Sequence, residues 1–213
     1  MRKAGDVFRE GILATNRADP IGKGAFGVVY TSDVPGNVMK QVHYNAAADL
    51  KNEVNMQAVA AEMGIAPKVA GLETFAGGVG DRIEMQDIRN NFEPHSANHQ
   101  FPAGTDAVRV NQQLGALALK GIGLEDRHNG NIVYNKITGR PLQLDFGNSR
   151  KIAGEDQVIA LAEATEAGLE AAGLAQEAKI YRGIVYDFLN GGQVAEAMDV
   201  AKQGFSRLQK IKP

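Results

Sequence analysis

Residues 126–131 read Asp-Arg-His-Asn-Gly-Asn, and this stretch is the strongest local signal in the chain. It follows a helix-like segment and a glycine turn, and it precedes the strand-like run 132–134. Its first residue, Asp126, and its last, Asn131, are five positions apart in one predicted loop. A loop aspartate can orient a hydroxyl or accept its proton, and an asparagine amide oxygen can ligate Mg²⁺. Polar turns of this kind are common, so the stretch gains its weight from what surrounds it.

The next signal downstream is the tripeptide Asp-Phe-Gly at 145–147, fourteen residues after Asn131. It follows the strand-like run 142–144. A carboxylate at the end of a strand can be presented to Mg²⁺, which prefers oxygen ligands. Taken alone, the tripeptide is equally consistent with an ordinary strand-ending turn.

Upstream, residues 22–30 read GKGAFGVVY, with glycines at 22, 24 and 27. Glycines in this spacing let a backbone approach phosphates and donate N–H groups to them. A dinucleotide-binding fingerprint is disfavoured because that motif opens a helix, whereas residues 28–30 continue as a strand. A flexible hairpin without a ligand stays open as the structural alternative.

A lysine and a glutamate follow the glycine run. Lys40 lies thirteen residues after Gly27 on the alternating segment 38–42, which predicts a half-buried strand. Glu53 lies on a predicted helix over 49–63, with Glu62 as a rival for the same role. Lys40 could pair with phosphates and Glu53 could hold it in place, although both residue types are ordinarily solvated surface groups.

The order of these five features resembles the protein kinase-like superfamily over residues 21–147. The resemblance implies an α+β, bilobal protein-kinase-like fold with ATP bound between its lobes. We expect a small antiparallel β N-lobe with one helix over about 1–86, a hinge at about 86–90, and a reduced helical C-lobe over about 91–213. The subtype that it indicates is a minimal serine/threonine kinase, as in effectors and phages.

The resemblance also assigns roles to residues. Asp126 would be the catalytic base, with Lys40 contacting phosphates while paired to Glu53. Asn131 and Asp145 would hold Mg²⁺. The residues expected to bind ATP are Gly22, Lys23, Gly24, Ala25, Phe26, Gly27, Val28, Lys40, Met85 and Ile88.

The acceptor side departs from the protein kinase pattern. Residues 124–126 read Leu-Glu-Asp where protein kinases usually have His-Arg-Asp, and His128 stands where serine/threonine kinases usually carry lysine. Asp-x-His-x-x-Asn looks more like aminoglycoside or choline phosphotransferases, and Asp-Arg-His-Asn is similar to phosphoinositide kinases. The stretch 148–154 is too short for a conventional activation segment.

Three hypotheses therefore stay open. The first is a protein serine/threonine kinase with a host or partner protein as substrate. The second is a small-molecule or lipid hydroxyl kinase. The third is a pseudokinase that binds nucleotide without transferring phosphate.

Composition limits the remaining classes. The 213 residues are 44% hydrophobic, which allows a proper core, and contain no cysteine, which excludes disulfides and thiolate metal sites. A net charge of −2 gives no sign of nucleic-acid binding. Because the sequence has neither an apolar run of about 18 residues nor a signal-peptide core, we expect a cytoplasmic protein. Delivery into a host cell without a cleaved signal is compatible with this expectation. The sequence does not fix the oligomeric state, and a monomer is favoured.

The remaining periodicity predicts the other elements. We expect an amphipathic helix at 1–14, strands at 69–75 and 82–88, a polar linker at 90–105 and a helix at 106–120. From residue 156 onward the chain is alanine-rich and predicts helices. Breaks are expected near Gly173, at 190–192 and near Gly204.

Overall fold

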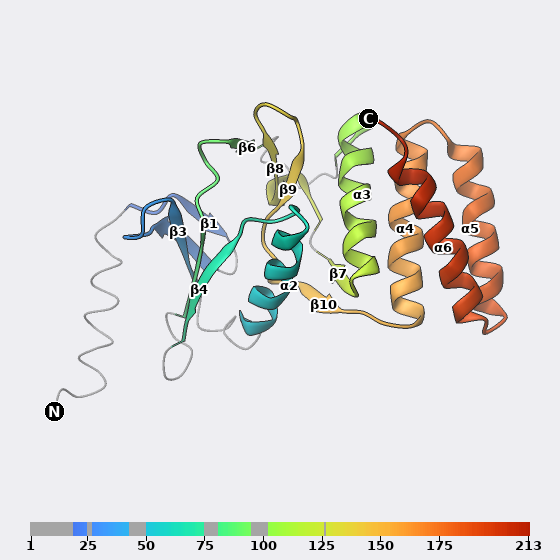
Figure 1. Ribbon diagram of the computed structural model, residues 1–213, viewed down its shortest axis with the longest axis horizontal. Coiled ribbons are helices and arrows are strands. Elements are labelled where there is room, and N and C mark those ends of the chain that lie inside the picture. Colours follow the sequence, from blue (N-terminus) through green and yellow to red (C-terminus); the bar gives the residue numbers. More distant parts are fainter. Residues whose placement is uncertain (1–18, 25–26, 43–49, 75–80, 95–101, 126) are drawn as a thin grey trace. The chain divides into compact units, whose positions relative to one another are not determined.

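The computed structural model describes residues 19–24, 27–42, 50–74, 81–94, 102–125 and 127–213 (Figure 1). The predicted helix at 1–14 and the predicted site residues Ala25, Phe26 and Asp126 lie outside the described residues. The chain divides into two compact units, Met1–Asn90 and Asn91–Pro213. The hinge expected at 86–90 stays a prediction.

The first unit is built on an antiparallel sheet of five strands in the order β1-β2-β3-β5-β4. The strands are β1 (Gly22–Gly24), β2 (Gly27–Thr31), β3 (Asn37–Val42), β4 (Val69–Glu73) and β5 (Arg82–Gln86). The helix α2 (Leu50–Glu62) comes between β3 and β4 in sequence. Its buried Leu50 packs with Val42 and Ile83 of the sheet in one apolar cluster.

Alternation along β3 decides which side chains face this cluster. Val38, Lys40 and Val42 are buried, whereas the residues between them are half-buried. Because successive side chains of a strand point to opposite faces, Lys40 is directed to the same face as the two valines. A charged side chain thus lies among the apolar residues of the sheet.

The second unit combines two small antiparallel sheets with a group of helices. One sheet contains β6 (Phe92–Pro94), β8 (Ile132–Asn135) and β9 (Pro141–Gln143), and the other contains β7 (Ile122–Leu124) and β10 (Ser149–Lys151). The helices are α3 (Gly104–Leu119), α4 (Glu155–Ala171), α5 (Ala175–Asn190) and α6 (Val194–Gln209), with a 3₁₀ turn at Asn129–Asn131.

The segment 90–105, expected to be a linker or loop, contains the short strand β6, which pairs with β8. Proline at position 94 and a polar composition hide this strand from a periodicity argument. Proline is tolerated there because β6 is an edge strand of its sheet.

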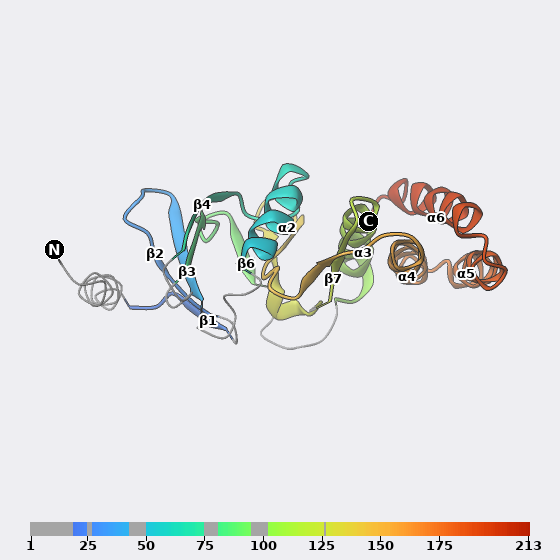
Figure 2. The ribbon, with the colours of Figure 1, turned by 90° about the horizontal axis from the view of Figure 1, so that it is seen from below.

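The helices of the second unit share one apolar core. Figures 1 and 2 show α4 between α3 and the α5–α6 pair. Buried residues from the four helices meet in it, including Val108, Leu161, Val185 and Phe205. This core is the main source of apolar burial in the second unit.

A helix break expected near Gly204 was wrong, since α6 runs through it to Gln209. A Cβ atom at Gly204 would lie 2.2 Å from Cε2 of Tyr181 on α5. Glycine therefore serves here to admit an aromatic ring between two helices. The breaks expected near Gly173 and at 190–192 are present between α4, α5 and α6.

These elements confirm the α+β class, with an antiparallel sheet and one helix in the first unit and a largely helical second unit. Among the described residues, no helix is long and apolar enough to cross a membrane.

Candidate active site

The most unusual contact in the first unit is an ion pair inside it. Lys40 Nζ on β3 donates a hydrogen bond to Glu53 Oε1 on α2 at 2.5 Å. Lys40 is 8% exposed and Glu53 is 3% exposed. Glu53, the predicted partner of Lys40, is therefore the residue that pairs with it. Glu62, the alternative partner at the end of α2, is exposed.

The glycine run forms a hairpin rather than the start of a helix. Strand β1 pairs with β2 so that Gly24 opposes Gly27, with residues 25–26 between them. A Cβ atom at Gly27 would lie 2.5 Å from the carbonyl oxygen of Gln41 on β3, so the close approach of two strands explains that glycine. At Gly22 a Cβ atom would meet Val29 at an ordinary 3.8 Å, so packing does not require glycine there.

The two predicted metal ligands lie at the same end of neighbouring strands. Strands β8 and β9 are antiparallel, with Ile132 opposite Gln143. The pairing continues one step further, because the Leu144 N–H donates to the Asn131 carbonyl at 2.7 Å. Asn131 therefore lies across from Leu144, and Asp145 follows directly.

Asp145 has an unusual backbone. Among the described residues, it is the one non-glycine with a positive φ, at 55°. This left-handed conformation costs about 1 kcal/mol or more for most side chains and is better tolerated by aspartate. Its side chain accepts a hydrogen bond from the Gly147 N–H at 3.2 Å, and the next residue, Phe146, is fully buried. The turn thus anchors the phenylalanine and leaves the carboxylate partly exposed.

His128 has a local structural task. Its Nδ1 accepts a hydrogen bond from the Gly130 N–H at 3.0 Å and caps the turn Asn129–Asn131. A Cβ atom at position 130 would lie 2.8 Å from the imidazole, so glycine is needed beside it. This cap gives His128 and Gly130 a structural role in the turn.

A hollow of about 300 Å³ lies beside Glu125 and Arg127 in the second unit. Its floor is apolar and comes from α3, β7 and α4, while Glu125, Arg127, Arg150 and Asp156 supply charged groups. The Arg127 N–H donates to the Glu125 carbonyl at 3.1 Å. Sequence reasoning did not identify this hollow or Arg150.

Two of the residues expected to bind ATP, Met85 and Ile88, lie near and just beyond the end of β5. Met85 Sδ accepts a hydrogen bond from Gln57 Nε2 on α2 at 3.8 Å, and the same amide group donates to the Pro67 carbonyl at 3.1 Å. Ile88 is half-buried just beyond the strand. Arg89, which follows Ile88, donates to the Asp87 carboxylate and lowers the pKa of Asp87.

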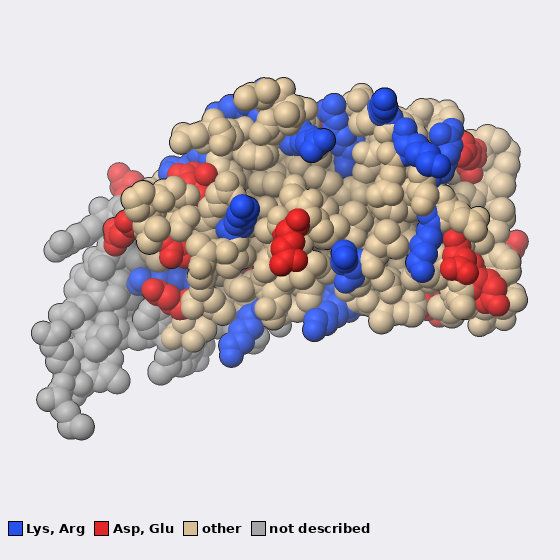
Figure 3. Space-filling model, viewed as in Figure 1, with Lys and Arg blue, Asp and Glu red and all other residues tan. Residues whose placement is uncertain are grey.

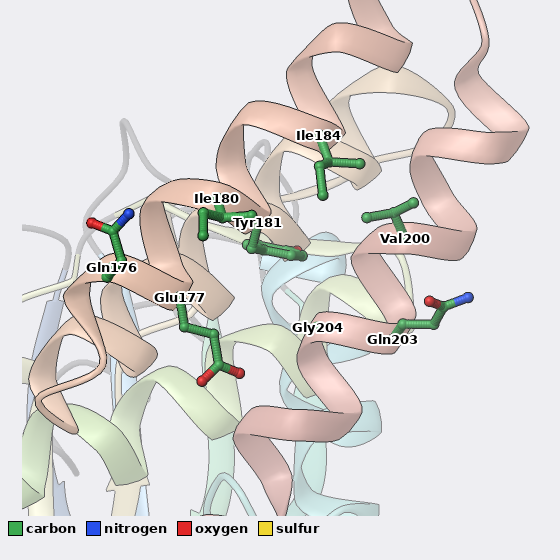
Figure 4. A pocket seen from close by; sticks show the side chains of 8 residues that line it. All are labelled: Gln176, Glu177, Ile180, Tyr181, Ile184, Val200, Gln203 and Gly204. Carbon is green, nitrogen blue, oxygen red and sulfur yellow. The ribbon is translucent and has the colours of Figure 1, made fainter.

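A second, larger hollow of about 460 Å³ is lined entirely by α5 and α6 (Figure 4). Ile180, Ile184 and Val200 supply apolar walls, with Tyr181 between the two helices (Figure 4). Burial raises the pKa of Tyr181 to about 12. The groups predicted to do chemistry belong to other elements.

Charged groups elsewhere are mixed in sign. On the face shown in Figure 3, basic and acidic side chains are interspersed.

Burial, then the charge of Asp106, raises the pKa of Tyr134 on β8 to about 12, so this phenol stays neutral at ordinary pH.

No protein-family model matches the chain, and no curated protein matches it in sequence. Among solved structures, the chain is similar to the PknI kinase domain of Mycobacterium tuberculosis, crystallised as a double mutant. The TM-score is 0.49 and the sequence identity 19%, and the match covers 71% of this chain and 70% of that chain.

Proposed function

We propose that this chain is a Mg²⁺- and ATP-dependent phosphotransferase that acts on serine or threonine hydroxyls of a protein. The observation that carries the proposal is the buried Lys40–Glu53 pair. Burying two charges costs several kcal/mol, and the attraction between them often fails to offset that cost. A pair of this kind is weak evidence for stability, and a lysine held at a defined point on a sheet is suited to binding phosphate.

The two donors at the start of β8 and after the end of β9 suit Mg²⁺. Asp145 would supply a carboxylate oxygen and Asn131 an amide oxygen, both of which are hard ligands. Among the described residues there is no cluster of three or more acidic or histidine side chains. Mg²⁺ needs no such cluster, because it is commonly held by one or two carboxylates together with substrate phosphates. When bound, the ion would neutralise charge that develops on the transferred phosphoryl group.

In this proposal Asp126 acts on the acceptor. Its carboxylate would orient the attacking hydroxyl and take its proton as the oxygen–phosphorus bond forms. Lys40, held by Glu53, would position the phosphates, and the hairpin β1–β2 would donate backbone N–H groups to them. The chain then contributes positioning and charge stabilisation, which are the main requirements of phosphoryl transfer.

Two observations support a protein as the acceptor. The His128 side chain, which suggested a small-molecule kinase, is accounted for by the cap on the Gly130 N–H. The chain after β10 forms α4, α5 and α6, and these pack into one core with α3. Little of the described C-terminal part is therefore left to enclose a small substrate.

The test is transfer of γ-labelled phosphate from ATP, with Mg²⁺, onto candidate proteins. We expect label on a protein, and Asp126→Ala should lose at least about 100-fold in turnover, the usual contribution of general-base assistance. Asp187→Ala, an exposed aspartate on α5, is the control that should keep full activity. Label only on small metabolites would favour the second hypothesis, and Mg-ATP binding without transfer would favour the pseudokinase.

A further inference from the structure

Arg150 on β10 joins two elements of the second unit that are distant in sequence. Its Nε donates to Glu125 Oε1 at 2.7 Å and its Nη1 donates to Asp156 Oδ2 at 2.9 Å. Glu125 directly follows the last residue of β7, and Asp156 lies in the first turn of α4. One guanidinium thus connects the start of the loop 125–131 with a helix.

The planar guanidinium presents its donors in a fixed fork. It can therefore satisfy two carboxylates in different directions at once, which a lysine ammonium does with less directional constraint. Strand pairing holds the backbone of Arg150 opposite Gly123 of β7. The side chain is consequently fixed at its root by a strand and at its tip by Glu125 and Asp156.

Two other arginines of the second unit provide a comparison. Arg182 pairs with Glu166, and Arg207 pairs with Glu177, but each of these pairs joins helices that already share the apolar core. Exposed pairs of this type, including those of Arg150, contribute little to global stability, about 0–1 kcal/mol, so what distinguishes the arginines is which elements each pair joins. Glu125 differs, because it lies outside the strand that precedes it and has no helix to fix it.

The connection from Asp145 to α4 is short, so only nearby contacts can hold Glu125 in place. The Ser149 N–H and hydroxyl both donate to the Phe146 carbonyl, and three residues separate β10 from α4. No inserted segment in this described stretch lies between the turn at Asp145 and the helix. Through its side chain, Arg150 therefore links Glu125, at the start of the loop, to Asp156 of α4.

We infer that Arg150 is a positioning residue: it holds Glu125, and through it the start of the loop that carries Asp126, against β10 and α4. The inference rests on the proposed function for its catalytic consequence. Its structural part, the restraint of the loop, is independent of that function. Misplacement of a reacting group by about 1 Å can cost up to about 100-fold in rate.

The experiment compares Arg150→Ala with Arg182→Ala in the full chain. The two side chains are similarly exposed, at 53% and 57%, and both form exposed ion pairs, Arg150 with two carboxylates and Arg182 with one, so Arg182→Ala is the matched control. Two quantities are measured: turnover in the phosphate-transfer assay, and amide hydrogen exchange of the peptide spanning 122–131. We expect Arg150→Ala to lower turnover about tenfold with little change in the KM for ATP, and to speed exchange at least about fivefold. Arg182→Ala should change neither.

A double-mutant cycle separates positioning from general destabilisation. If Arg150 acts through Glu125, the pair Arg150→Ala with Glu125→Ala should be no slower than either single variant. Arg150→Lys should recover part of the turnover, since it keeps the charge but not the fork.

The outcomes distinguish the two claims. A wild type that transfers no phosphate, with exchange that still depends on Arg150, would refute the proposed function and support the restraint. Full turnover and unchanged exchange in Arg150→Ala would overturn the inference and leave the function standing. Additive losses in the cycle would also overturn it.

Discussion

The first unit buries an ion pair beside its apolar cluster, whereas the contact between α5 and α6 in the second unit buries apolar and aromatic groups. Between β3 and α2 an ion pair, Lys40 with Glu53, is almost fully buried. Between α5 and α6 the buried groups are apolar or aromatic, and Gly204 admits the ring of Tyr181. Burying the ion pair carries a free-energy penalty of desolvation. Burying the apolar groups stabilises the folded state.

If the proposed function holds, the residues that carry activity are different from the helix contacts that carry most of the apolar burial. Substitutions in the proposed site should remove activity and leave the folded state largely intact. Substitutions between the C-terminal helices should do the reverse.

The largest effect is expected at Asp145. Asp145→Ala should abolish Mg-ATP-dependent transfer, because the carboxylate proposed to hold the metal is lost. Asp145→Asn tolerates the left-handed backbone, so it should remain as stable as the wild type and still be inactive. Activity is measured by phosphate transfer and stability by urea unfolding, with Asp199→Ala on α6 as the control. An Asp145→Ala variant with full activity would remove the metal role from this residue.

A smaller effect is expected from pH on the helical side. Burial raises the pKa of Tyr181 to about 12 in the folded chain, above the value of about 10 for an unfolded tyrosine. Its contribution to stability is therefore complete below pH 10 and is lost as pH rises toward 12. The loss is about 2–3 kcal/mol in the free energy of unfolding.

Unfolding measured between pH 9 and 12 checks this sign. Tyr181→Phe should flatten the decline, and Tyr134 should maintain a residual slope because its pKa is raised in the same direction. An equally steep decline in Tyr181→Phe would show that this phenol is not the group responsible.

The smallest effect is expected at Gly204. A Cβ atom there would meet the Tyr181 ring at 2.2 Å, so Gly204→Ala should destabilise by about 1–2 kcal/mol through overpacking. Gly183→Ala on α5 is the matched control, since a Cβ atom there has nothing within 4 Å. That control should stabilise by about 0.5–1 kcal/mol, as expected for alanine in a helix. Transfer activity per folded molecule should be unchanged in both, and a loss in Gly204→Ala at full folding would break the separation.

The sequence predicted the strands and helices whose residue spacing is regular, such as β3 and α2. Alternation around Lys40 and the helical spacing around Glu53 identified β3 and α2, and their order in the chain predicted that the two charges would pair. The strand–turn–strand run around 132–144 was equally readable, because short apolar runs flank a polar turn.

Features that depend on tertiary contact could not be read in this way. Strand β6 is stabilised by pairing with β8 rather than by its own composition. Gly204 looks like a helix breaker until the Tyr181 ring is present. The ion pairs of Arg150 join positions 25 and 6 residues away, and no periodicity connects them. The roles proposed for Asp126, Asn131 and Asp145 stay predictions.

The most direct test of the central claim is calorimetric titration of Mg-ATP into the wild type and into the double variant Lys40→Met, Glu53→Leu. Replacing both partners avoids an uncompensated buried charge, and such replacements are often neutral or stabilising by about 1–4 kcal/mol. We predict a double variant that is folded and at least as stable as the wild type, yet binds Mg-ATP at least about tenfold more weakly. Unchanged affinity in a folded double variant would contradict the claim that the pair is retained to bind nucleotide.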